Sequence, residues 1–315
     1  MKEALLVQDK QKIIAVFIAL LAVYIVWGST YLGIKIAIET LPPFLMAGSR
    51  FFIAGILLYS VAWIKVKKHP PLQAWKDTSI VGVLLLLGGN GLVVWAEQSI
   101  PSSIASLVIA TVPLWIIIIS KISRSENQAN KGVVFGTLLG FLGVAILMFP
   151  FNALNDMSSI HLDTSGMMSV IAAAILWSLG SVYSQRAKMP SLLILSTAMQ
   201  MIAGGVALLL VSFCMQEWQY VIYENFSSRS IIAFFYLTLV GSLMGYTAYI
   251  WLLKNTTSFL ASTYAFVNPI VAIFLGYIFA DEVLTKPMIL AALMIIGAVV
   301  TIIVFKSKKK NDRAA

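Results

Sequence analysis

Ten windows of about 20 mostly apolar residues follow one another along the chain, separated by short polar connections. A helix needs roughly 20 apolar residues to cross the hydrocarbon core of a bilayer, whereas a membrane β-barrel shows segments of about ten residues that alternate in polarity. The windows are residues 13–38, 44–64, 79–97, 102–120, 132–150, 166–184, 192–214, 231–253, 258–279 and 287–305. The sequence therefore predicts an all-α integral membrane protein with ten transmembrane helices.

The scarcity of charge supports this class of protein. Only 11% of the 315 residues are charged and 60% are hydrophobic, whereas a soluble domain has about 25% charged residues. The first window is too long for the core of a signal peptide and has no small-residue cleavage site after it, so we expect it to remain as a span. The single cysteine, Cys214, cannot form an intrachain disulfide, and its apolar window predicts a packing role.

The placement of lysine and arginine predicts the orientation of the chain. If the ten helices alternate in direction, Arg229 and Lys286 lie on one side of the membrane, and Lys35 and Arg50 lie inside windows. Every other lysine and arginine then falls on the side that holds both ends of the chain. Because basic loops remain in the cytoplasm, we expect both termini to lie on the cytoplasmic side of the cell membrane. The net charge of +9 is thereby explained without a nucleic-acid partner.

Two stretches of the chain, residues 88–113 and 244–269, repeat one another at a spacing of 156 residues. The matched pairs include Gly89–Gly245, Trp95–Trp251, Ser102–Ser258 and Pro113–Pro269. Residues 26–31, VWGSTY, are echoed by residues 176–183, LWSLGSVY. The chain is therefore expected to consist of two five-helix halves, and because five is odd, the second half enters the membrane from the opposite side.

This repeat predicts the organisation of the whole chain. The predicted segments are a cytoplasmic N-terminus (1–12), a first five-helix repeat (13–150), an extracytoplasmic linker (151–165), a second five-helix repeat (166–305) and a basic cytoplasmic tail (306–315). Inverted repeats around a central cavity are the usual basis of alternating access, in which a site near the midplane opens to one side of the membrane at a time.

Three segments of the sequence resemble a known superfamily. They are VYIVWGSTYLGIKIAIETLPPFLMAGSRFFIAG (23–55), NGLVVWAEQSIPSSIASLVIATVPL (90–114) and TSFLASTYAFVNPIVAIFLGYIFADEVLT (257–285). In this order they resemble the drug/metabolite transporter (DMT) superfamily and, more narrowly, its ten-helix EamA-type transporters, over about residues 13–305. The resemblance implies a gradient-coupled or proton-coupled carrier of small organic metabolites, often an exporter.

The sequence departs from the superfamily pattern at two places. Many members end helix 4 with a Gly-Glu pair, where this chain reads RSEN (124–127), and the matching place after helix 9 reads ADEV (280–283). We therefore assign no transport role to Glu126 or Glu282 and interpret them as anchors at loop ends.

Polar and aromatic side chains inside the apolar windows are the candidates for a substrate path. They are Trp27, Ser29, Thr30, Tyr31, Asn90, Trp177, Ser181, Tyr183, Tyr264 and Asn268. Aromatic rings with hydroxyl groups suit the binding of a small amphipathic solute, although small and hydroxyl residues also serve packing between membrane helices. Pro113 and Pro269 are expected to lie mid-helix, as fixed kinks or as hinges that expose a carbonyl to the path.

Three charged residues lie within or at the ends of spans. Arg50 is expected about 9 Å inside the outer end of its helix at 1.5 Å per residue, and Glu97 and Lys35 approach the same side. The aligned places in the second half, Ala198 or Met199 and Leu253, are uncharged. Arg50 is either a snorkelling residue with Glu97 as structural partner, or the two form a breakable gating pair in which Glu97 couples transport to protons.

Motifs for other functions are missing from the sequence. The two histidines, His69 and His161, fall in loops on opposite sides of the membrane, and neither a phosphate-binding loop nor a zinc-protease motif occurs. We therefore expect no metal, no cofactor and no catalytic residue, with a small-molecule substrate, the lipid bilayer and protons as partners. The alternatives to a transporter are an intramembrane lipid-modifying enzyme and a non-transporting membrane receptor.

Overall fold

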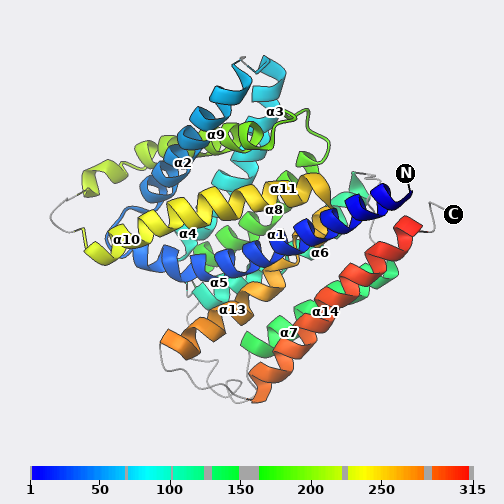
Figure 1. Ribbon diagram of the computed structural model, residues 1–315. Coiled ribbons are helices and arrows are strands. Elements are labelled where there is room, and N and C mark those ends of the chain that lie inside the picture. Colours follow the sequence, from blue (N-terminus) through cyan, green and yellow to red (C-terminus); the bar gives the residue numbers. More distant parts are fainter. Residues whose placement is uncertain are drawn as a thin grey trace.

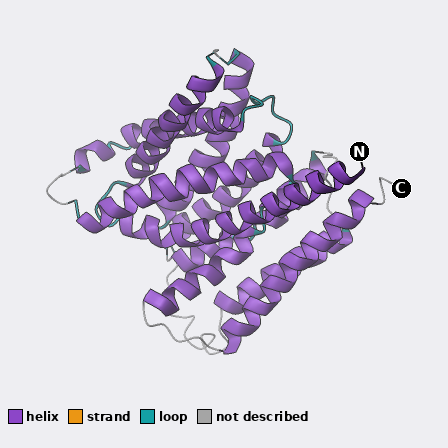
Figure 2. Cartoon of the chain, in the orientation of Figure 1, coloured by secondary structure: helices purple, strands orange, loops and turns teal. Residues whose placement is uncertain are grey.

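The computed structural model describes residues 2–67, 70–100, 102–123, 130–148, 163–221, 226–279 and 286–311, and within these ranges the chain forms helices and turns without strands (Figure 2). Most of the expected linker 151–165 lies outside the described residues. So do His69, His161, Glu126 and Glu282.

The helices follow the predicted windows closely. In the first half they are α1 (Lys2–Ala37), α2 (Pro43–Val66), α3 (Leu72–Gly82), η1 (Val83–Gly91), α4 (Leu92–Ala96), α5 (Ser102–Ile109), α6 (Val112–Ile122) and α7 (Lys131–Met148). In the second half they are α8 (Thr164–Ser184), α9 (Leu193–Cys214), η4 (Glu217–Tyr220), α10 (Ser228–Tyr236), η6 (Leu237–Tyr246), α11 (Thr247–Asn255), α12 (Ser258–Ala261), α13 (Tyr264–Phe279) and α14 (Lys286–Asn311).

The length and composition of these helices identify a membrane protein. Among the described residues, six helical stretches are long and apolar enough to cross a bilayer. Four shorter apolar stretches accompany them, at Val112–Ile122, Lys131–Gly143, Ser258–Val271 and Ala292–Ile302. The helical membrane fold is thus confirmed, and ten complete crossings stay a prediction.

The structure corrects several expectations about local structure. Helix α1 begins at Lys2, ahead of its membrane-crossing stretch Gln11–Ala37, so most of the expected N-terminal segment 1–12 is helical. Windows 102–120 and 258–279 are each divided into two helices. Pro113 therefore lies in the first turn of α6, where its missing N–H leaves no hydrogen bond unmade, and only Pro269 lies inside a helix. Cys214, expected to pack, is exposed at the end of α9.

Two π-helices interrupt the long helices of the two halves. They are η1 and η6, and adding the repeat spacing of 156 to η1 gives 239–247, which overlaps η6. Hydrogen bonds from residue i to i+5 widen the helix, and this arrangement is rare except near functional sites. Apolar periodicity alone did not predict it.

Helices of the two halves pack reciprocally. Helix α2 lies against α9, and α7 lies against α14 as a separate pair (Figure 1). Helix α1 packs on α10, η6, α11 and α13, while α8 packs on η1, α4, α5 and α6. The first helix of each half is thus embedded in the other half.

Glycine allows the close contact between α2 and α9. A Cβ atom on Gly55 would lie 2.8 Å from the backbone nitrogen of Ile202, and one on Gly205 would lie 2.6 Å from that of Phe52. Gly205 follows Gly55 by 150 residues, and Ile202 follows Phe52 by the same 150. Small residues at the contact let two membrane helices approach until their backbones touch.

The N-terminus of α8 is held by Asp163. Its Oδ2 accepts hydrogen bonds from the backbone N–H of Gly166 at 2.9 Å, from Ser99 Oγ at 2.8 Å and from the hydroxyl of Ser165. These donors, led by the two serine hydroxyls, lower the pKa of Asp163 to about 2. The charged cap thus ties the start of α8 to the segment that follows α4.

Gly205→Ala is expected to destabilise the protein by about 1–3 kcal/mol, because the new methyl group forces α2 and α9 apart. The control is Gly297→Ala, since a Cβ atom there meets nothing within 4 Å. That change is expected to be neutral or stabilising by about 0.5–1 kcal/mol. Thermal unfolding of both variants in detergent tests this, and equal unfolding temperatures would contradict the packing described.

Candidate functional site

A buried cavity lies where α1, α2, η1, α8, η6 and α13 meet, and we call it the central cavity. Its volume is about 70 Å³, which is room for roughly five water molecules at about 10–15 Å³ each. Seven of the predicted path residues line it, namely Trp27, Thr30, Tyr31, Asn90, Trp177, Tyr264 and Asn268. Arg50 lines it too, as do Phe51, Ser242 and Tyr246, which the sequence analysis did not single out.

Three predicted path residues lie outside the lining of this cavity. Ser29 Oγ donates to the carbonyl of Val26 and shares a hydrogen bond with the hydroxyl of Tyr236. The hydroxyl of Tyr183 donates to Asp77 Oδ1 at 3.2 Å. Ser181 supports the cavity wall from behind, through a 2.7 Å hydrogen bond to the hydroxyl of Tyr249.

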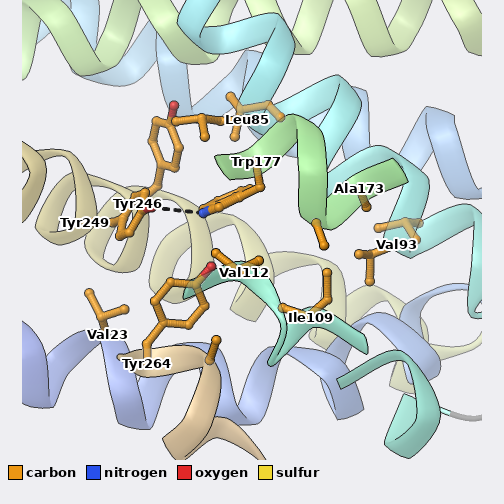
Figure 3. Packing of buried hydrophobic residues seen from close by; sticks show 14 of the residues in the cluster. Val23, Leu85, Val93, Ile109, Val112, Ala173, Trp177, Tyr246, Tyr249 and Tyr264 are labelled. Atoms are coloured by element: carbon orange, nitrogen blue, oxygen red, sulfur yellow. Dashed lines mark hydrogen bonds between the residues drawn. The ribbon is translucent and has the colours of Figure 1, made fainter. Parts of the chain in front are cut away.

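Three aromatic rings, those of Trp27, Trp177 and Tyr264, line the central cavity, and the ring of Tyr249 packs against all three of them. The ring centroid of Trp27 lies 5.3 Å from that of Trp177, 4.9 Å from that of Tyr249 and 4.8 Å from that of Tyr264. The contacts of Trp27 with Trp177 and Tyr264 are edge-to-face, the arrangement that aromatic quadrupoles favour. Trp177 Nε1 donates to the Tyr249 hydroxyl at 3.0 Å (Figure 3). Packing therefore fixes these rings in place.

Glycines in the two π-helices seat the tryptophans. A Cβ atom on Gly89 of η1 would lie 2.3 Å from the Trp177 ring, and one on Gly245 of η6 would lie 2.6 Å from Trp27 Nε1. Each half thus supplies a glycine that receives the tryptophan of the other half. The match between Gly89 and Gly245 in the sequence is explained by this contact.

Arg50 is buried in the cavity wall with donors to spare. Its side chain is 2% exposed, and one terminal nitrogen donates to Asn90 Oδ1 at 2.5 Å. Its Nε is buried without a hydrogen-bond partner. The guanidinium carbon lies 4.5 Å from the centroid of the neighbouring Phe51 ring.

Glu97 follows α4 directly and is fully buried, and neither carboxylate oxygen has a hydrogen-bond partner. The expected pair between Arg50 and Glu97 is not formed in this conformation: one guanidinium nitrogen donates to Asn90, and neither Arg50 Nε nor the Glu97 oxygens have a hydrogen-bond partner. Lys35 is exposed and donates to the backbone carbonyl of Glu97 at 2.9 Å. The carboxyl group is left unpaired.

The second half contains an uncharged counterpart of this cluster. The contacts between α2 and α9 relate the two helices by a spacing of 150 residues, so Gln200 is the residue of the second half that corresponds to Arg50. This corrects the expected correspondence with Ala198 or Met199. The 156-residue spacing places Tyr246 opposite Asn90. The Tyr246 hydroxyl donates to Gln200 Oε1 at 2.8 Å, in the place of the Arg50–Asn90 bond.

Lys35 and Glu97 also have uncharged counterparts in the second half. Gln185 lies 150 residues after Lys35, and Leu253 lies 156 residues after Glu97. Gln185 Nε2 donates to the carbonyl of Leu253 at 3.5 Å, as Lys35 donates to that of Glu97. At these corresponding positions the two halves make similar hydrogen bonds, but only the residues of the first half, Lys35, Arg50 and Glu97, are charged.

A second cavity, of about 290 Å³, lies at the ends of α8, α9 and α11. Ser196 and Gln185 contribute to its lining. Gln200 Nε2 donates to Ser196 Oγ at 3.2 Å, and Gln200 accepts from Tyr246, which lines the central cavity. The side chain of Gln200 therefore links a lining residue of one cavity to a lining residue of the other through hydrogen bonds.

A helical membrane fold with a cavity between its helices, lined by aromatic and polar side chains, is typical of polytopic membrane transporters. The EamA-like transporter family matches residues 13–149 and again residues 164–304, and the chain belongs to this family. Among the described residues, no group of three or more His, Cys, Asp or Glu side chains could hold a metal ion.

Similar proteins carry transporter names. The chain is 36% identical over 293 residues to the uncharacterized inner membrane transporter YedA of Escherichia coli (strain K12), covering 93% of this chain and 92% of that protein. It is 26% identical over 289 residues to the uncharacterized transporter YoaV of Bacillus subtilis (strain 168), covering 90% and 94%. A solved crystal structure shares the fold at a TM-score of 0.73 and 18% identity, over 94% of this chain and 99% of that one.

Trp27→Ala and Tyr264→Ala are each expected to abolish transport while leaving the amount of protein in the membrane largely unchanged. The reason is that both rings face the central cavity. The control is Trp218→Ala, which removes a ring that is 57% exposed. Export is measured as the metabolites that reach the medium only when cells make the protein, and the amount in the membrane by immunoblot. A parallel loss of export and of membrane protein would show that the two rings serve packing alone.

Proposed function

We propose that the protein is a secondary active transporter that exports a small organic metabolite or drug-like solute across the cytoplasmic membrane by alternating access. The observation that carries this proposal is the central cavity. It is built by helices of both family-matching halves, and it combines an aromatic wall with a buried cation. A few polar groups set in a mostly apolar lining are typical of small-molecule sites.

The two halves are inferred to be inverted five-helix repeats. The family matches the chain twice, and the contacts are exchanged between the halves: Gly55 with Ile202 and Gly205 with Phe52, Gly89 with Trp177 and Gly245 with Trp27. Such reciprocity is what a pseudo-twofold axis produces, and five helices in each half would place that axis in the membrane plane. The start of α1 and the end of α14 lie on the same side of the view in Figure 1, in agreement with termini that share the cytoplasmic side.

The lipid bilayer is inferred to surround the outer helices. Large apolar side chains are exposed along them, for example Phe17 of α1, Phe135 of α7 and Phe213 of α9, which are 58%, 62% and 69% exposed. Exposed apolar surface on this scale marks contact with another apolar phase.

The Gln200–Tyr246 hydrogen bond is inferred to be a gate. What supports this is that Gln200 is hydrogen-bonded both to Tyr246 of the central cavity and to Ser196 of the second cavity, which is lined by Lys254 and which the charge distribution assigns to the cytoplasmic side. Breaking one neutral hydrogen bond costs about 0.5–1.5 kcal/mol, so thermal motion can open such a gate.

Glu97 is proposed to be the proton-coupling group. Its carboxyl group is buried in a membrane-embedded part of the fold without hydrogen bonds, between the cavity residue Arg50 and the exposed Lys35. Ionisable groups in such places are rare and are typical of proton relays in transporters. The leucine at the corresponding position, Leu253, shows that the fold itself needs no carboxyl group there.

Glu97→Gln is expected to make export insensitive to the proton gradient while solute binding is retained, because the amide cannot release a proton. The matched control is Glu217→Gln. Glu217 is also buried, but its carboxylate accepts hydrogen bonds from the backbone N–H groups of Phe44 and Leu45 and from Ser212. The control is therefore expected to lower thermal stability and to keep the coupling.

The measurement is solute efflux from cells or vesicles at several imposed pH gradients, with and without a protonophore. If Glu97→Gln efflux keeps the pH dependence of the wild type, Glu97 has a structural role and another group couples transport.

A further inference from the structure

We propose that Arg50 and Asn90 form a subsite that binds the carboxylate group of the transported solute. This inference rests on the proposed transport function and narrows its substrate class to carboxylates. It is carried by the unused donors of a buried guanidinium that lines the central cavity.

The donors of Arg50 exceed what the protein itself uses. A guanidinium has five N–H donors. One terminal nitrogen of Arg50 donates to Asn90, while Nε is buried without a partner. Because Asn90 accepts through Oδ1, its Nδ2 group remains a donor beside the same cavity. A planar guanidinium and a neighbouring amide match the two oxygens of a carboxylate in geometry and in charge.

The packing of the helices does not require this charge. At the corresponding position in the second half, Gln200 joins α9 to η6 by one neutral hydrogen bond to Tyr246. Gln200 is fully buried, as Arg50 nearly is. A buried cation without an ion pair destabilises the fold more than a buried amide does. Its presence in one half alone is explained by an anionic ligand.

Glu97 does not occupy this subsite in the structure. Its oxygens have no hydrogen-bond partner, and Arg50 makes no ion pair with it. The two residues nevertheless interact through their charges. Protonation of Glu97 therefore removes a nearby negative charge that repels an anion, and it favours binding of an external carboxylate at Arg50. Proton binding and carboxylate binding are thereby linked.

The other residues that line the central cavity indicate the chemistry of the rest of the solute. Trp27, Trp177 and Tyr264 form an aromatic wall. A cavity of about 70 Å³ is small, so the bound solute is compact or the cavity widens around it. We expect a carboxylate attached to a small apolar or aromatic body.

The test compares acids with their amides, which match them in shape and lack the charge. The probes are acetate, benzoate, phenylacetate and N-acetylphenylalanine, each with its amide, added to the purified full-length protein in detergent. Thermal unfolding reports binding, because a ligand that binds only the folded state raises the unfolding temperature. At least one acid is expected to raise it at concentrations at least tenfold lower than its amide does.

Arg50→Gln, which copies Gln200, is expected to remove the preference for the acid. Arg50→Lys keeps the charge without the planar fork, and it is expected to fold and to retain a weaker preference. The control is Lys65→Gln, which removes an exposed cation from the last turn of the same helix α2. It is expected to leave the preference unchanged, because Lys65 is not among the residues that line the central cavity.

The outcomes separate this inference from the proposed function. If no acid in the panel is preferred over its amide, or if Arg50→Gln keeps the preference, the carboxylate subsite is overturned. If cells that make the protein export neutral solutes alone, the subsite is wrong and the transport function stands. If export is the same with and without the protein, the transport function itself is contradicted.

Discussion

The shape of the central cavity depends on the exchange of two tryptophans between the halves of the chain. Trp177 lies against Gly89 of η1, and Trp27 lies against Gly245 of η6. The two rings then meet edge to face at 5.3 Å in the centre of the molecule. Because each half supplies both a glycine and a ring, neither half can complete the wall of the central cavity alone. A movement of either half relative to the other therefore changes the wall of the central cavity.

On this reciprocal framework the charges are distributed unequally. The hydrogen bonds Arg50–Asn90 and Gln200–Tyr246 occupy corresponding places, yet the first pair contains a cation. The carboxyl group of Glu97 likewise corresponds to the side chain of Leu253. In the proposed transport cycle, the neutral Gln200–Tyr246 bond is the gate, and Arg50, Asn90 and Glu97 form the cluster that binds the solute and couples transport to protons.

Much of this arrangement could be predicted from the sequence, because apolar length and repeat spacing directly reflect the bilayer and the duplication. The helix bounds and the lining by Trp27, Asn90 and Tyr264 followed from that reasoning. The π-helices did not, since apolar windows do not distinguish i+4 from i+5 hydrogen bonding. The residue of the second half that corresponds to Arg50, Gln200, was also missed. Corresponding residues are 150 positions apart in the first two helices of the halves and 156 positions apart in the later helices, and only the contacts reveal that change.

The central claim is that one cavity between two inverted halves opens alternately to the two sides of the membrane. Ser242 lines that cavity and differs from cysteine by one atom, so Ser242→Cys in a Cys214→Ala background provides a probe of access. A membrane-impermeant thiol reagent is applied from either side of oriented vesicles, with Tyr246 intact or changed to Phe. The account predicts labelling from both sides, with Tyr246→Phe raising the rate from the cytoplasmic side and lowering it from the other. Labelling from a single side in both proteins, with rates that Tyr246→Phe leaves unchanged, would contradict it.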